Sequence, residues 1–79
     1  MHVLMLVAHG SKREESNLEI ESLAQKIALF KVKDFEVVMP AFLEFAKPSI
    51  TEAIDKCTFI GATKVTILPY FLSAGVHIA

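Results

Sequence analysis

A chain of 79 residues, of which 53% are hydrophobic and 22% charged, has room for one globular domain. Its net charge of −1, with both signs interspersed, disfavours a general nucleic-acid binder, which would carry a basic stripe. No apolar run approaches the roughly 18–20 residues of a membrane span, and the amino terminus lacks the basic region of a signal peptide.

The first predicted element is a strand over residues 3–8 (VLMLVA), a continuous apolar run typical of a parallel strand buried on both faces. A turn over residues 9–11 (HGS) follows. Ser11 with Glu14 three residues later matches a capping box, so we expect a helix over residues 13–30. Its apolar positions at helical spacing are Leu18, Ile20, Leu23, Ala24, Ile27, Ala28 and Phe30.

The second strand is expected over residues 35–43 (FEVVMPAFL). Pro40 within it cannot donate a ladder hydrogen bond, which indicates an edge strand or a bulge. Pro48 then stands where a first-turn proline belongs, and Gly61 is a good residue to end that helix. The apolar positions between them are Ile50, Ala53, Ile54 and Cys57.

The third strand is predicted over residues 63–71 (TKVTILPYF), and the residues after it are typical of a loop that enters another helix. The alternation of strands and helices predicts an α/β fold with a parallel sheet, in the order 2-1-3 of flavodoxin-like sheets, with the two helices on opposite faces. The third strand is very apolar, and an uncovered apolar edge invites pairing with another chain. We therefore take residues 1–79 as a single partial domain, or as a small protein with an obligate partner.

Three polar residues follow the three predicted strands, and parallel strands end on one rim of their sheet. His9 comes after the first strand, Glu44 at the end of the second, and His77 beyond a loop after the third. Neutral imidazole binds first-row divalent metals, and a carboxylate beside it completes a coordination shell or accepts protons. Two histidines and one carboxylate leave open positions for a substrate, as a catalytic metal site requires.

Each of these residues also has a purely structural interpretation. His9 could orient the tight turn before Gly10, and His77 could be a polar residue early in a helix. Glu44 could be a solvated loop carboxylate. Their joint placement on one rim favours the functional interpretation without excluding the structural one.

Four further residues could bind a substrate. Lys12 and Arg13 open a helix, where the dipole disfavours cations, so they either attract an acidic substrate or form a solvated face. Tyr70 and Phe71 are either packing residues or an aromatic wall for a ligand of tetrapyrrole size. Cys57, the single cysteine, lies on an apolar helix stripe, is expected in the core, and fits a reducing cytoplasm.

Three blocks of the sequence, VAHGS, PAFLEFAKPSI and LPYFLSAGVHI, resemble the sirohydrochlorin chelatase family in order and in spacing. These small class II chelatases insert cobalt or iron into sirohydrochlorin, for cobalamin or siroheme. The resemblance covers essentially the whole chain and implies a flavodoxin-like chelatase half-domain, whose short members act as homodimers. It places the family's metal-site histidines on His9 and His77, and its acidic residue on Glu44.

The resemblance implies a lyase whose substrates are the tetrapyrrole and a divalent metal, Co²⁺ or Fe²⁺, with Ni²⁺ also suited to these ligands. The helix start at Ser11, Lys12 and Arg13 would anchor a substrate carboxylate. No organic cofactor is expected, since no phosphate-binding Gly-rich loop is present. Family members continue past the second histidine, so we expect this chain to lack their C-terminal strand and helices.

The expected partners are a second copy or a complementary chain, with no nucleic acid and no membrane. The alternative function is that of a non-catalytic fragment, which binds metal or tetrapyrrole and needs a partner chain.

Overall fold

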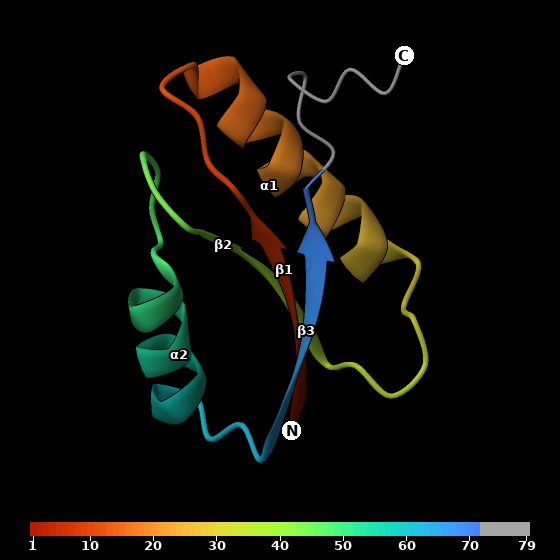
Figure 1. The fold of residues 1–79 in the computed structure, drawn as a ribbon. Coiled ribbons are helices and arrows are strands. Elements are labelled where there is room, and N and C mark those ends of the chain that lie inside the picture. Colours follow the sequence, from red (N-terminus) through yellow and green to blue (C-terminus); the bar gives the residue numbers. More distant parts are fainter. Residues whose placement is uncertain (72–79) are drawn as a thin grey trace.

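The computed structural model describes residues 1–71, which form a three-stranded parallel sheet with two helices (Figure 1). The elements are β1 (His2–Ala8), α1 (Glu14–Leu29), β2 (Val37–Phe42), α2 (Ile50–Phe59) and β3 (Lys64–Tyr70). Both strand pairings are parallel and the order is β2-β1-β3, which confirms the predicted α/β fold and its 2-1-3 sheet. Neither helix is long and apolar enough to cross a membrane.

β1 is the central strand, and its apolar run is buried from Val3 to Ala8. The side chains of Val3, Met5 and Val7 pack on one face against Ala53 and Cys57 of α2. Because side chains alternate along a strand, the remaining β1 residues face the other side of the sheet, where α1 packs on β2 and β1 (Figure 1). The helices lie on opposite faces and Cys57 is a core residue, as predicted.

β2 is an edge strand of this sheet and contains Pro40, as the missing proline N–H predicts. It begins at Val37, two residues later than expected, because the chain before it is still turning. Asp34 has φ +76, and the Phe35 N–H donates to the Val32 carbonyl at 3.3 Å. β3 is likewise one residue shorter at each end than expected.

α1 begins at Glu14, with Arg13 as its N-cap residue and no side chain capping it. The predicted capping box is wrong because Ser11 lies two residues too early, and its Oγ accepts instead from the Arg13 N–H at 3.0 Å. The predicted apolar stripe is also partly wrong, because the buried face centres on Asn17 and Ala24. Three residues of the predicted apolar stripe, Leu18, Ala28 and Phe30, are therefore exposed.

α2 begins with a capping box between Ser49 and Glu52. Ser49 Oγ accepts from the Glu52 N–H at 3.1 Å, and the Glu52 carboxylate accepts from the Ser49 N–H at 2.9 Å. Pro48 therefore precedes the cap, and the prediction that it occupies the first turn is wrong. Ile54, one of the apolar positions at helical spacing, is exposed on this short helix.

The C-terminal end of α2 confirms Gly61 as the residue that ends the helix. Gly61 has φ +84, and its N–H donates to the Thr58 carbonyl at 3.1 Å. The Ala62 N–H donates to the Cys57 carbonyl at 2.9 Å, which completes a Schellman motif. The helix thus ends at a defined residue before β3.

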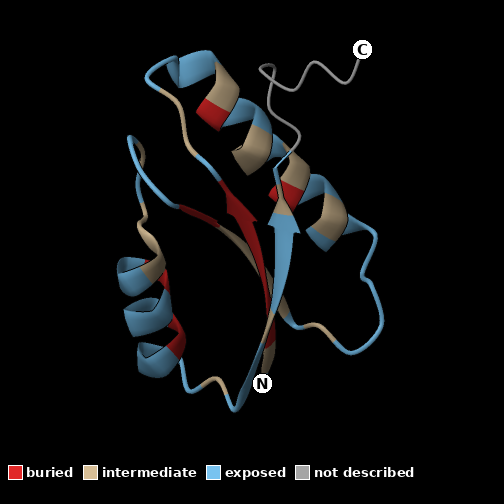
Figure 2. Cartoon of the chain, in the orientation of Figure 1, coloured by how far each residue is buried: buried red, intermediate tan, exposed pale blue. Residues whose placement is uncertain are grey.

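β3 is the least covered strand (Figure 2). None of its residues is buried, and Val65, Ile67, Leu68 and the following Phe71 are exposed apolar side chains. Among residues 1–71, nothing pairs with its outer edge. This is the exposed apolar surface that the sequence predicts.

Candidate functional site

The carboxyl ends of β1 and β2 bring His9 and Glu44 together at one rim of the sheet. His9 directly follows β1, and Glu44 lies two residues after β2. Main-chain bonding continues past both strands, because the Leu43 N–H donates to the Ala8 carbonyl and the Glu44 N–H to the His9 carbonyl, each at 3.0 Å. The backbone therefore holds the two residues side by side, as the rim prediction requires.

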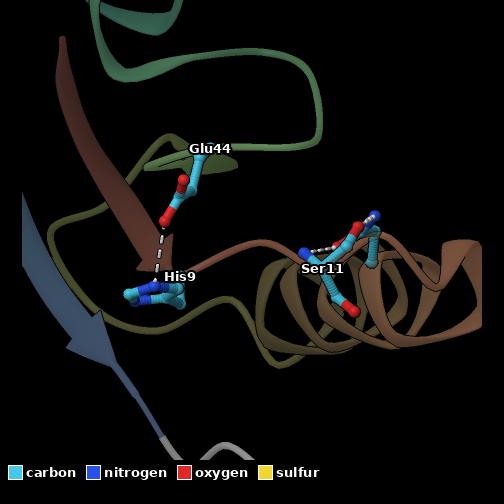
Figure 3. A network of polar contacts seen from close by, with 4 residues as sticks. His9, Ser11 and Glu44 are labelled. Atoms are coloured by element: carbon cyan, nitrogen blue, oxygen red, sulfur yellow. Dashed lines mark hydrogen bonds and ion pairs between the residues drawn. The ribbon is translucent and has the colours of Figure 1, made fainter.

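The side chains of His9 and Glu44 meet in the space beyond this rim (Figure 3). His9 Nε2 lies 3.2 Å from Glu44 Oε2, and the two side chains are 59% and 53% exposed. A pair this exposed contributes about 0–1 kcal/mol to stability, so it does little to hold the fold together. The imidazole and the carboxylate are instead open to a ligand.

Gly10 allows the two loops to approach each other. It has φ +92, a conformation that favours glycine, and a Cβ at this position would collide with the carbonyl oxygen of Glu44. Both the backbone conformation and the close approach therefore require glycine. The tight turn predicted from the sequence is confirmed, and it also serves as the contact surface for the Glu44 backbone.

Lys12 reaches from the β1–α1 loop to the β2–α2 loop. Its Nζ lies 5.5 Å from the centre of the Phe45 ring, which is cation–π range. Phe45 follows Glu44 directly, so the Lys12 ammonium lies on the loop that carries the Glu44 carboxylate. Arg13 is exposed at the N-cap of α1.

Asn17 belongs to this region and was not predicted from the sequence. It is buried, its Nδ2 donates to the Ser11 carbonyl at 2.8 Å, and its Oδ1 accepts from the Ser11 N–H at 2.9 Å. A signal for it exists, because Asn17 stands seven residues before Ala24 on the apolar helix face, where a polar side chain needs a partner. Ser11 is consequently held through its main chain.

Tyr70 and Phe71 lie at the carboxyl end of β3, next to the end of β1. Tyr70 is the register partner of Ala8, and both aromatic residues line an open hollow of about 1130 Å³ together with His9 and residues of α1. Glu44 lines a second, smaller hollow of about 380 Å³ on the side of the β2–α2 loop. His9 thus borders the larger hollow and Glu44 the smaller one.

His77, the third predicted ligand, lies outside the described residues. Among residues 1–71, no group of three or more His, Cys, Asp or Glu side chains is placed to hold a metal. The pair that is present, His9 and Glu44, lies at the 3.2 Å separation of an ion pair, with both side chains open to solvent.

Comparison with known proteins identifies the family. The family model CbiX matches residues 3–79. The chain belongs to the CbiX family. Among relatives of this CbiX chain, the chloroplastic sirohydrochlorin ferrochelatase of Arabidopsis thaliana is 41% identical over 75 residues, which are 94% of this chain and 32% of the relative. The sirohydrochlorin cobaltochelatase of Methanopyrus kandleri is 35% identical over 77 residues, 98% of this chain and 52% of the relative.

The CbiX fold is confirmed by a solved CbiX protein from Marinobacter aquaeolei VT8. It superimposes with a TM-score of 0.71 at 31% sequence identity, covering 99% of this chain and 62% of the other. The chain spans about half the length of most of the curated CbiX relatives that it matches. The family predicted from three sequence blocks is therefore the family that the comparisons show.

Proposed function

We propose that this chain takes part in inserting a divalent metal, Co²⁺ or Fe²⁺ with Ni²⁺ as a further candidate, into sirohydrochlorin. The observation that carries the proposal is the open His9–Glu44 pair, 3.2 Å apart on the rim of a CbiX-family sheet. Relatives named for both cobalt and iron insertion support the substrate class. The same ligand atoms suit all three metals.

In the proposed mechanism, His9 and His77 hold the incoming metal through neutral imidazole nitrogens. Metal and protons compete for these nitrogens, so the metal binds the unprotonated form. Two pyrrole N–H protons must leave the tetrapyrrole as the metal enters. Glu44 accepts these protons or serves as a third ligand, and its exposure allows proton exchange with water.

Substrate binding is assigned to the residues around this pair. Sirohydrochlorin carries many carboxylates, for which Lys12, Arg13 and Ser11 at the start of α1 provide cations and a hydroxyl. Tyr70 and Phe71 form an aromatic wall on the hollow beside His9. A hollow of about 1130 Å³ supports a ligand of tetrapyrrole size.

The test is to mix the full chain with Co²⁺ and sirohydrochlorin and to follow the absorbance spectrum as metal is inserted. We expect His9→Ala to slow insertion by at least tenfold, on the order of the effect of removing a catalytic proton-transfer or metal-binding group. His2→Ala is the matched control, because His2 lies at the opposite end of β1, where its Nε2 is 2.6 Å from Thr66 Oγ1. Insertion by His9→Ala at the wild-type rate would contradict the assignment.

The alternative proposal is a fragment that binds metal or tetrapyrrole and needs a partner chain for turnover. Its support is the exposed His9–Glu44 pair, which offers two ligand atoms to a metal without requiring turnover. A chain that binds Co²⁺ but inserts none would favour this alternative. Insertion by the chain alone would exclude it.

A further inference from the structure

The two side chains at the rim are not held in place by packing around them. His9 is 59% exposed and Glu44 is 53% exposed, so neighbouring side chains cover only part of each. Their relative position therefore depends on the backbone that carries them, above all on the turn of residues 9–11. Whatever fixes that turn decides whether His9 meets Glu44.

The loop after β2 holds one side of this turn, and α1 holds the other. On the β2 side, the Glu44 N–H donates to the His9 carbonyl, and Gly10 lies against the Glu44 carbonyl. On the α1 side, the Asn17 amide bonds both the N–H and the carbonyl of Ser11; dashed lines at Ser11 in Figure 3 mark these bonds. A single side chain thus binds both main-chain groups of Ser11.

The chemistry of asparagine matches this task. Its carboxamide carries a donor and an acceptor side by side, whereas an ionised aspartate only accepts and a leucine of the same branched shape does neither. Asn17 is only 9% exposed, on the helix face that also buries Ala24. Packing alone would favour an apolar side chain there, so the two bonds to Ser11 explain the asparagine.

We propose that Asn17 is a positioning residue, which clamps Ser11 and thereby holds His9 beside Glu44. The effect passes through Ser11 and the turn to the rim. The role of Asn17 adds to the proposed function. It rests on that function only for the identity of the ligand that His9 and Glu44 bind.

The test uses Asn17→Leu, which keeps the branched shape of the side chain and suits the apolar face of α1 but removes both bonds to Ser11. We expect only a modest loss of stability in urea, because water can reach the half-buried Ser11 and replace the lost bonds. The amide of Glu44 should exchange its hydrogen about tenfold faster, because its bond to His9 depends on the turn. Co²⁺ affinity of the full chain should fall by at least about tenfold, as is usual when the support of a metal ligand is removed.

Two comparisons separate positioning from a general loss of structure. The Ala62 amide, bonded to Cys57 at the end of α2, should keep its exchange rate in Asn17→Leu. Cys57→Ala, a core change on the other face of the sheet, should lower stability without selectively speeding exchange at Glu44. Equal acceleration at Glu44 and Ala62, or wild-type exchange at Glu44, would overturn the proposal.

A second variant covers the case in which Asn17→Leu does not fold. Asn17→Asp keeps the size and the acceptor but replaces the donor to the Ser11 carbonyl by an anionic oxygen, and it should show the same selective exchange at Glu44. A wild-type chain that binds no Co²⁺ would count against the proposed function alone. The exchange experiment would still decide whether Asn17 holds the turn.

Discussion

Gly10 and Gly61 both have a positive φ, but their surroundings differ. A Cβ at Gly10 would collide with the Glu44 carbonyl, whereas a Cβ at Gly61 would meet no atom within 4 Å. Gly61→Ala should therefore lower the free energy of unfolding by about 1–2 kcal/mol, the penalty for placing alanine in the left-handed conformation. Gly10→Ala should cost clearly more in urea unfolding and should also weaken Co²⁺ binding, because the Glu44 backbone must move away.

Gly61→Ala is thus the control for Gly10→Ala, since it carries the same conformational strain at the far end of α2. Equal losses of stability in the two variants, with Co²⁺ binding unchanged in both, would show that the approach of Gly10 to Glu44 has no role in the site. A selective loss of binding in Gly10→Ala would support one.

Of the two helices, α2 has the better-defined start, because its N-cap side chain is hydrogen-bonded and that of α1 is not. The Ser49 N–H donates to the Glu52 carboxylate, and this bond lowers the pKa of Glu52 below its ordinary value of 4.5. A carboxyl whose pKa is lowered by folding stabilises the protein above the ordinary pKa, and this contribution is lost as the pH falls through the lowered pKa. The capping box should therefore weaken in acid.

Glu52→Gln should lower the urea midpoint at pH 7, because it removes the charge that the Ser49 N–H stabilises. The difference from the wild type should shrink at pH 3, where the Glu52 carboxyl of the wild type is increasingly protonated. Asp55→Asn, on the same helix, removes an equal charge outside the cap and serves as the control. A loss of stability for Glu52→Gln that is the same at both pH values would contradict this role for the charge.

The two helix starts show why one sequence pattern has two outcomes. The spacing Ser-x-x-Glu occurs at Ser11–Glu14 and at Ser49–Glu52, and only the second forms a capping box. At Ser11 the main chain is already bound by Asn17. The N-cap then lies two residues later, at Arg13, because the bonds between Asn17 and the Ser11 main chain compete with the capping box.

For the whole molecule, the consequential feature is the exposed apolar surface of β3. Ile67 is 54% exposed at the middle of the strand, and the outer edge of β3 pairs with nothing among residues 1–71. Such an edge favours association, and we propose that a second copy of the chain covers it. Light scattering should then give twice the mass of one chain.

Ile67→Lys should shift the chain towards monomer by roughly tenfold, because a charge on this surface would be buried in the dimer. Ile54→Lys is the matched control, since Ile54 is similarly exposed, at 47%, but lies on α2. A wild-type monomer would contradict the homodimer and favour a complementary chain. Equal shifts of the monomer–dimer equilibrium in the two variants would place the dimer interface away from β3.

The sequence by itself determined the order of the elements and the residues that gather at the rim. Apolar runs and helical spacing are local properties, and parallel strands necessarily end on one side, so His9 and Glu44 were found without coordinates. The three sequence blocks likewise determined the family. His77 remains a prediction, since it lies outside the described residues.

Only the tertiary structure decided how the rim is held. The contact of Gly10 with Glu44 and the cation–π contact of Lys12 with Phe45 each join the β1–α1 loop to the β2–α2 loop. Their distances depend on how α1 and the β2–α2 loop pack around β1, and no local pattern encodes that packing. The physical reason is that a hydrogen bond is made or lost within a few tenths of an ångström, whereas periodicity fixes only which face a side chain occupies.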